Sequence, residues 1–288
     1  MAKIVLDFDD YSPVDMEKRL EATSLRKANL TWLSLLMLSI LAGSFIALGS
    51  EFFTLVIFDS TLSVGFTRLI GAFCFSLGLI LVIVAGAELF TGNNLVIMGF
   101  ASGVVTYKQV LKNWVGSYIG NFIGSISVVF LMFFTNLWKM KDYALGAKIV
   151  QIAADKVNLT FVEGIARGIL CNALVCLAVW LCLSARSVIS KIGAIIFPIT
   201  AFVASGFEHS IANMYFIPMG LLLKNNQKVI DALLKVNPNI NLSNLGVLGL
   251  LGNLFSVTLG NMIGGAIMVG VVYWIIIVLP VRLKDKKT

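Results

Sequence analysis

The chain has 288 residues, of which 58% are hydrophobic and only 13% charged, and its formal net charge is +7. Because soluble domains carry about a quarter of charged residues, this composition excludes an ordinary soluble protein and indicates a membrane protein. Its Lys and Arg residues lie mostly in the termini and between apolar stretches, without a basic stripe or motif, so we expect no nucleic-acid partner.

The N-terminal segment, residues 1–28, is polar and mixed in charge, and it does not resemble a cleavable signal peptide. Ser12 followed by Pro13 predicts the start of a helix. We therefore expect three parts: a cytoplasmic helix and tail over 1–28, a transmembrane channel domain over 29–281, and a cytoplasmic tail over 282–288.

Six apolar stretches are long enough to cross a bilayer as helices, which requires about 20 residues each. The second, fifth and sixth are longer than one crossing needs, and such excess length indicates either a tilted helix or one that breaks and resumes inside the membrane. The stretches cover about 30–50, 68–101, 114–138, 160–184, 192–223 and 248–280.

The distribution of positive charge predicts the orientation. With six crossings, 13 Lys and Arg residues fall on the side of the two termini and 7 on the other side, and Arg68 and Arg167 fall within the stretches. Excess positive charge marks the cytoplasmic side. We expect a multi-pass protein of the cell's inner membrane with both termini in the cytoplasm.

An internal repeat relates the two halves of the chain. NWVGSYIGNFIG (113–124) matches NLFSVTLGNMIG (253–264), and AELFTGNNL (87–95) matches FEHSIANM (207–214). Glycines four residues apart allow close helix contact, so we interpret the Gly and Asn residues of the first pair as packing residues. A unit of three crossings has to be inverted in its second copy, and inverted 3+3 repeats are typical of channels and transporters.

The second matched pair is unusually polar for a membrane segment. GFEHSIANM (206–214) contains the single histidine of the chain, His209, directly after Glu208. Irregular backbone at membrane depth has to be buried in protein or line a cavity, and ionisable groups there indicate function. We therefore predict that the second and fifth helices are interrupted at the midplane and that His209 faces a substrate pathway.

Two roles for His209 follow from its chemistry. An anion loses its hydration at great cost when it crosses a bilayer. A histidine, a Thr hydroxyl and helix N-termini can stabilise the anion at the midplane. Alternatively, the histidine can help to protonate the anion, so that a neutral weak acid passes an apolar constriction, with Glu208 tuning or relaying the proton. The residues alone leave both roles open.

GFEHSIANMYFIPMG, AELFTGNNL and GAFCFSLGLILVIVAG resemble the formate/nitrite transporter family, and its formate channels above all, over about residues 28–280. The resemblance implies an aquaporin-like fold, a homo-pentamer with one pore in each protomer, and passage of formate, nitrite or hydrosulfide, in some members with a proton. It implies no cofactor and no enzymatic activity.

The resemblance also implies roles for residues at matching positions. The central group facing the substrate comprises His209, Thr91, Glu208, Asn213 and Asn172. The outer constriction comprises Phe75, Leu79 and Phe202, and the inner one comprises Leu89, Phe90 and Val175. Lys156, which we place in the outer loop before the fourth stretch, would attract the anion. The chain departs from the formate channels of the family in two places: Glu88 stands where they have Asp, and Gly92 stands where they have a small hydroxyl residue.

Alternative functions have weaker support in the sequence. A water or glycerol facilitator would carry paired Asn-Pro-Ala motifs, and the one Asn-Pro dipeptide, at Asn237, lies in a polar loop. An enzyme with a metal or haem is disfavoured, because the single histidine and four cysteines show no ligand spacing. A nitrite or hydrosulfide channel of the same architecture stays open, since these anions share the charge and size of formate.

Overall fold

The computed structural model describes residues 10–285, and within them the chain is helical throughout its regular structure. The first half contains α1 (Pro13–Ala28), α2 (Trp32–Ile57), α3 (Val64–Ala85), α4 (Phe90–Asn93), α5 (Val96–Ala101), α6 (Tyr107–Thr135) and the short η1 (Leu137–Lys139). The second half contains α7 (Met140–Val157), α8 (Phe161–Ser184), α9 (Val188–Ala204), α10 (Ser210–Leu223), α11 (Gln227–Val236), α12 (Val247–Met262), the π-helical η2 (Ile263–Val271) and η3 (Trp274–Val278), and α13 (Leu279–Asp285).

Five continuous helices in the described chain are long and apolar enough to cross a membrane: α2, α3, α6, α8, and α12 with its continuation through η3. The second and fifth apolar stretches of the sequence each form more than one helix. The second stretch contains α3, α4 and α5, and the fifth contains α9 and α10. Helix therefore stops between Ala85 and Phe90 and again between Ala204 and Ser210, inside stretches whose composition predicted an interruption.

Hydroxyl side chains define several helix starts. Thr106 and Thr160 each accept a bond from the backbone three residues on, while Gln109 and Glu163 bond back to the cap residue. This capping box satisfies two of the donors that a helix N-terminus leaves free. Ser12 caps α1 in the simpler way, and Pro13 follows it as the sequence predicted.

The repeat governs helix packing as predicted. A Cβ at Gly124 of α6 would lie 2.0 Å from the backbone oxygen of Ile40 in α2, and a Cβ at Gly264 would lie 2.1 Å from that of Ile169 in α8. Any side chain at these two glycines would force the helices apart. The close contact between α2 and α6 therefore has an equivalent in the second half of the chain, where α8 packs in the same way against α12 and η2, the helix that continues it.

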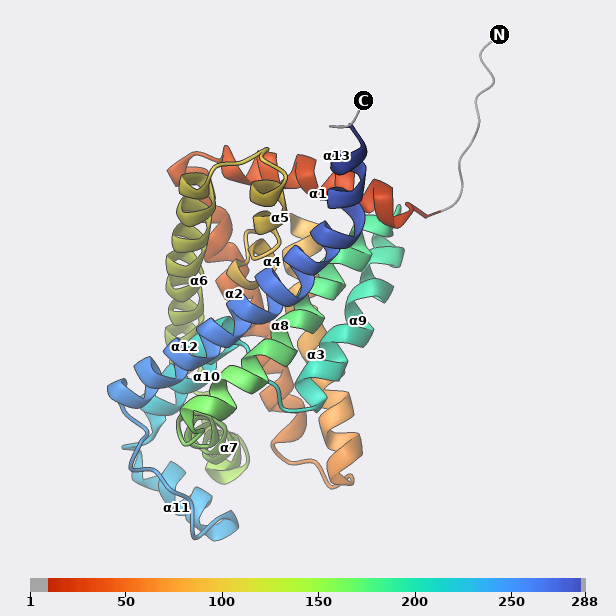
Figure 1. Cartoon of the computed structure of the whole chain (residues 1–288). Helices are drawn as coiled ribbons and strands as arrows, with labels where there is room; N and C mark the ends of the chain where they lie inside the picture. Colours follow the sequence, from red (N-terminus) through yellow and green to blue (C-terminus); the bar gives the residue numbers. More distant parts are fainter. Residues whose placement is uncertain (1–9, 286–288) are drawn as a thin grey trace.

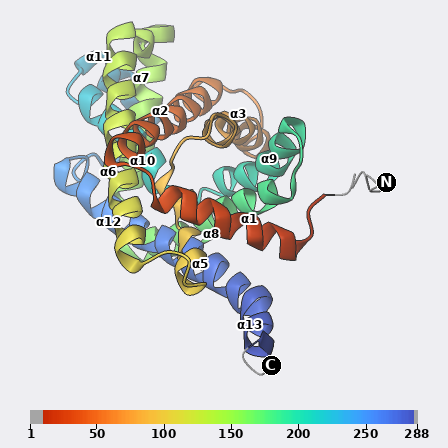
Figure 2. The same ribbon diagram turned by 90° about the horizontal axis from the view of Figure 1, so that it is seen from above.

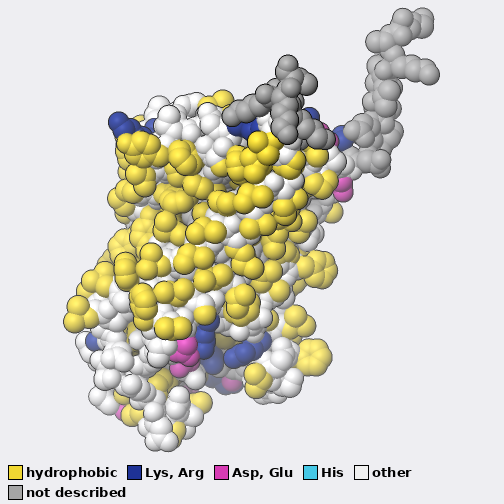
Figure 3. Space-filling view, viewed as in Figure 1, with side chains coloured by type: hydrophobic (Ala, Val, Ile, Leu, Met, Phe, Trp, Pro, Cys, Tyr) yellow, Lys and Arg dark blue, Asp and Glu magenta, His cyan; other side chains and the backbone are white. Residues whose placement is uncertain are grey.

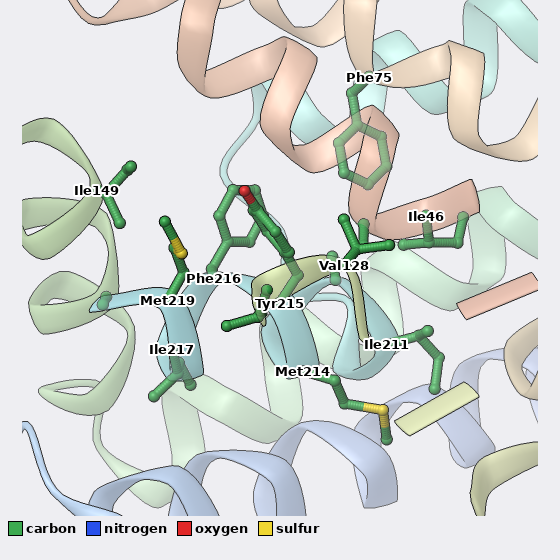
Figure 4. Packing of buried hydrophobic residues seen from close by; sticks show 14 of the residues in the cluster. Ile46, Phe75, Val128, Ile149, Ile211, Met214, Tyr215, Phe216, Ile217 and Met219 are labelled. Atoms are coloured by element: carbon green, nitrogen blue, oxygen red, sulfur yellow. The ribbon is translucent and has the colours of Figure 1, made fainter. Parts of the chain in front are cut away.

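Helix α10 lies at the centre of the bundle. All its residues from Ser210 to Gly220 are buried, and Figure 4 shows its side chains packing against Ile149 of α7, Val128 of α6, Ile46 of α2 and Phe75 of α3. A short helix that is buried on every side is surrounded by protein and not by lipid. The non-helical residues that precede α10 are therefore also enclosed by protein, as irregular backbone in a membrane protein has to be.

The surface carries an apolar belt on the face shown in Figure 3. Hydrophobic side chains cover the middle of that face, and charged side chains gather in a hollow at its lower end. Helices α1 and α13 lie together at the opposite end, and α1 crosses over the other helices there (Figures 1 and 2). The described parts nearest both chain ends therefore lie on one side of the belt, as the charge distribution predicted.

Candidate functional site

The two interruptions have the same backbone course. Each begins with a glycine in the left-handed region, Gly86 at φ 77° and Gly206 at φ 74°, and three residues without regular secondary structure follow before helix resumes. Residues other than glycine are strained at such backbone angles. We call residues 86–89 the first break and residues 206–209 the second break; equivalent positions are 120 residues apart, the offset of the sequence repeat.

Two equivalent asparagines hold the breaks in place. Asn121 of α6 accepts a hydrogen bond from the backbone N–H of Phe90 (2.9 Å) and donates to the backbone oxygen of Glu88 (3.0 Å). Asn261 of α12 likewise accepts from Ser210 (2.9 Å) and donates to the oxygen of Glu208 (2.9 Å). From the sequence we expected these asparagines to be packing residues. Their main task is to satisfy backbone groups that the breaks release from helical pairing.

Each break also places a buried glutamate beside an asparagine and a lysine. In the first break, Glu88 accepts hydrogen bonds from Asn93 (2.8 Å) and from Lys27 of α1 (2.8 Å). In the second, Glu208 accepts from Asn213 (2.6 Å) and from Lys156 (2.9 Å). A carboxylate at this depth requires a cation and hydrogen-bond donors, and both breaks supply them.

The placement of Lys156 corrects the sequence prediction. We expected this residue in a loop, but it lies in the last turn of α7, and its side chain is only 14% exposed. Lys27 was not predicted to belong to the site at all. Lys27 and Lys156 are 129 residues apart, outside the offsets of the repeat, so the matched motifs gave no signal for the equivalence of the two lysines.

Thr91 and His209 meet where the two breaks come together. The hydroxyl of Thr91 lies 2.9 Å from Nε2 of His209, and both side chains are buried. Asn172 of α8 supports this arrangement, because its Nδ2 lies within hydrogen-bond distance of the backbone oxygens of Thr91 (3.2 Å) and Asn261 (2.7 Å). These contacts bring together all five residues predicted for the central group, directly or through one neighbour.

The other nitrogen of His209 fixes the tautomer of the neutral ring. Nδ1 accepts a hydrogen bond from the backbone N–H of Ala212 (3.1 Å), as the N-cap of α10. A nitrogen that accepts in a neutral imidazole carries no proton, so the proton sits on Nε2. His209 therefore presents an N–H donor toward Thr91. A proton added to Nδ1 would break the cap of the helix.

Cavities approach this pair from opposite sides. The α7-side cavity has a volume of about 560 Å³ and reaches His209, Glu208, Phe75 and Phe202. The α1-side cavity has a volume of about 420 Å³ and reaches Glu88, Leu89, Leu79 and Gly92. No described residue lines both cavities, so the short buried segment around Thr91 and His209 separates them.

Two aromatic rings lie beside His209 in the wall of the α7-side cavity. Phe75 and Phe202 pack edge to face with ring centroids 5.7 Å apart, and the Phe202 ring lies 5.9 Å from that of His209. Leu79, which we predicted for the same constriction, instead lines the α1-side cavity with Leu89. Phe90 packs against Trp114 and Tyr118 of α6, and neither Phe90 nor Val175 lines the α7-side or the α1-side cavity.

The α7-side cavity is rich in charge. Its wall includes Arg68, Lys148, Lys156 and Arg167, together with Asp155 and Glu208. Burial lowers the pKa of Lys148 and raises the pKa of Asp155, while their mutual attraction opposes both shifts. The excess of cations over carboxylates makes this cavity attractive to small anions. Among the described residues, no group of histidines, cysteines and carboxylates could hold a metal ion.

Comparisons with known proteins agree with this geometry. The chain is 40% identical to the formate channel FocA of Escherichia coli strain K12, over 93% of this chain and 95% of that protein. Its structure superposes with a TM-score of 0.77 on a pentameric formate channel with formate bound, which is 38% identical; the match covers 85% of this chain and 97% of the other. An FNT family ion channel, 29% identical, matches with a TM-score of 0.75 over 91% of this chain and 98% of its own.

The family model of formate/nitrite transporters matches residues 14–275, which include both breaks, both lysine–glutamate pairs and the Thr91–His209 contact. The family relationship predicted from GFEHSIANMYFIPMG and AELFTGNNL is thereby confirmed. The chain belongs to the formate/nitrite transporter family.

Proposed function

We propose that this protein is a membrane channel for small monovalent anions of weak acids, and that formate is its substrate. The observation that carries the proposal is the contact between Thr91 and His209, buried between two cavities on opposite sides of the bundle. Family membership and the formate-channel relatives support the choice of substrate.

We propose a six-span, aquaporin-like architecture in which two units of three spans are inverted relative to each other. The first unit would contain α2, α3 with α4 and α5, and α6; the second would contain α8, α9 with α10, and α12 with its continuation. The equivalent bonds of Asn121 and Asn261 to the two breaks support this symmetry. On this arrangement the breaks lie near the membrane midplane, as in other proteins with inverted repeats.

In the proposed mechanism, an anion enters the α7-side cavity because of its cationic wall. Lys156 neutralises Glu208, so the anion approaches His209 without meeting an uncompensated carboxylate. The anion then passes Phe75 and Phe202, where apolar side chains remove much of its water. Hydrogen bonds from Nε2–H of His209 and the hydroxyl of Thr91 replace that water. Leu79 and Leu89 form the apolar exit toward the α1-side cavity.

This mechanism assigns His209 the role of a neutral hydrogen-bond donor. Because Nδ1 is engaged by Ala212, the ring gains no proton without losing the helix cap, which favours donation to the anion over protonation of it. Of the two roles that the sequence left open, the contacts support the first. Coupling of transport to protons stays a prediction.

We further propose that five protomers assemble, each with its own pore, in an inner membrane, with α1, α13 and both chain ends on the cytoplasmic side. The pentameric structure to which this chain is similar supports the assembly. The excess of Lys and Arg on the side of the termini supports the orientation. Residues 29–281 would form the channel, flanked by cytoplasmic segments.

The test is uptake of formate, nitrite, hydrosulfide and glycerol into proteoliposomes that contain the full-length protein, with empty liposomes as the control. We expect formate uptake well above that of empty liposomes and no uptake of glycerol. Larger flux of nitrite or hydrosulfide than of formate would keep the channel and change its substrate. Uptake of glycerol without any anion would contradict the proposal.

A further inference from the structure

A buried carboxyl lies in α2, away from both breaks. Glu51 is 8% exposed, and its Oε2 accepts a hydrogen bond from the hydroxyl of Tyr215 in α10. Within residues 10–285, Glu51 forms no ion pair, whereas Glu88 and Glu208 each pair with a lysine. A carboxyl that is buried without a cation requires a hydrogen-bond partner, and the phenol of Tyr215 is that partner.

Tyr215 and the residue after it attach α10 to α2. Tyr215 is 1% exposed. The Phe216 ring lines the α7-side cavity and packs edge-on against Phe53 of α2, with centroids 6.0 Å apart. Figure 4 shows the Tyr215 and Phe216 side chains leaving α10 in the same direction, with the phenol oxygen in red. The helix that His209 caps is thus attached to α2 by one hydrogen bond and one aromatic contact.

The same part of α2 also touches the backbone of α3. A Cβ at Gly49 would lie 2.9 Å from the backbone oxygen of Phe75, and a Cβ at Gly78 would lie 3.2 Å from Cα of Ile46. Contacts this close leave α2 and α3 little freedom to move apart. Helix α2 therefore supports both the backbone that carries Phe75 and the helix that His209 caps.

We propose that Glu51 is a positioning residue, which fixes the separation of Phe75 and His209 through its hydrogen bond to Tyr215 and so determines which anions pass between them. Apolar contacts between α2 and α10 supply attraction without direction, whereas a hydrogen bond also fixes orientation. Glu51 acts as an acceptor and does not touch the anion. The inference rests on the proposed function, because anion flux is its readout.

The test uses full-length protein in proteoliposomes and measures the ratio of formate flux to acetate flux. Y215F removes one hydroxyl, E51L removes the acceptor, and E51Q keeps an acceptor of similar shape. We expect E51Q to retain the wild-type ratio. We expect Y215F and E51L each to lower it about fivefold, the factor that corresponds to about 1 kcal/mol for one hydrogen bond. The double variant E51L/Y215F should be no worse than the more affected single variant.

The outcomes separate this inference from the proposed function. Wild-type protein that passes no formate would overturn both. If the wild-type protein passes formate, and Y215F and E51L keep its ratio of formate flux to acetate flux, the inference is overturned and the proposed function stands. This holds even if both variants lose thermal stability. The inference is also wrong if E51Q behaves like E51L, because the charge of the carboxyl would then matter rather than its hydrogen bond.

Discussion

The first and second breaks share their support and differ in what they present to the anion. Both have a left-handed glycine, an asparagine from a neighbouring helix, and a glutamate held by an asparagine and a lysine. At equivalent positions, however, the first break has Leu89 and the second has His209. The repeat thus builds one scaffold twice, and the difference between Leu89 and His209 places an imidazole donor in the second break alone.

The lysines differ as well. Lys156 comes from α7, whose buried residues pack into the central core, whereas Lys27 comes from α1, which crosses one end of the bundle. The lysine that pairs with Glu208 in the second break therefore comes from a helix of the bundle core. The lysine that pairs with Glu88 in the first break comes from a helix that lies across the end of the bundle. We expect the two sites to respond alike to changes in the scaffold and differently to changes in α1.

Loss of either scaffold asparagine should have the largest effect. N121L and N261L each leave one buried N–H and one buried carbonyl of a break unpaired, and we expect a loss of about 4 kcal/mol in stability, because each unpaired group costs about 1–3 kcal/mol. The thermal midpoint of the purified protein measures this loss. N239L, at an exposed asparagine, is the control. Equal midpoints for N261L and N239L would contradict the role of the asparagines.

Removal of a lysine comes next. K156M leaves Glu208 buried without a cation, and K27M does the same to Glu88, so we expect each to cost about 3 kcal/mol. Because the cost comes from the unpaired carboxylate, the double variant K156M/E208Q should recover most of the lost thermal stability. A double variant as unstable as K156M would show that Lys156 stabilises the protein in some other way.

Alanine at the two left-handed glycines should have a smaller and equal effect. A Cβ at Gly86 or Gly206 would meet no atom within 4 Å, so the cost is backbone strain alone, about 1 kcal/mol. Denaturation of G86A and G206A measures it. G193A, in α9 with equally open surroundings, should be neutral or stabilising. Unequal costs at the two breaks would mean that their backbones are not equivalent.

The smallest expected effect concerns α1. Burial, together with a hydrogen bond to Glu21, raises the pKa of Glu17 from its usual 4.5 to about 7, against the attraction of Arg282 and Lys18. The docked helix thus holds a proton that the free carboxyl releases, so docking is strongest below about pH 4.5 and weakens as the pH rises toward 7. The protection factors of the amides of residues 13–28, from which the intrinsic pH dependence of exchange has been divided out, should be larger at pH 5.5 than at pH 8, and E17Q should abolish the difference. Larger protection factors at pH 8 would contradict this account.

The sequence carried the signals for the helices and for the repeat, because apolar length and matched motifs are local properties. Composition also predicted that helix would stop in the second and fifth stretches, since residues such as Gly206, Glu208 and His209 suit a continuous lipid-facing helix poorly, and α3 and α9 end within these stretches. Family resemblance supplied the central residues, and the structure brings Thr91, His209 and Asn172 together.

Contacts between distant segments could not be predicted in the same way. Lys27 reaches Glu88 across 61 residues, outside the repeat. Asn261 resembled a packing residue because its bonds are to backbone groups, which no sequence pattern reveals. We predicted a loop position for Lys156 because a charged residue between two apolar stretches is usually exposed. Its place in α7 and its buried partner, Glu208, are visible only in the structure.

The central claim is that the donor at His209, absent from the first break, allows an anion to pass. H209L places leucine at equivalent positions of both breaks, and formate uptake by full-length wild-type and H209L protein, measured from pH 6 to pH 8, tests the claim directly. The account predicts that H209L lowers uptake about tenfold or more at every pH, the cost of one hydrogen bond to a charged group. Uptake by H209L equal to that of the wild type would contradict it.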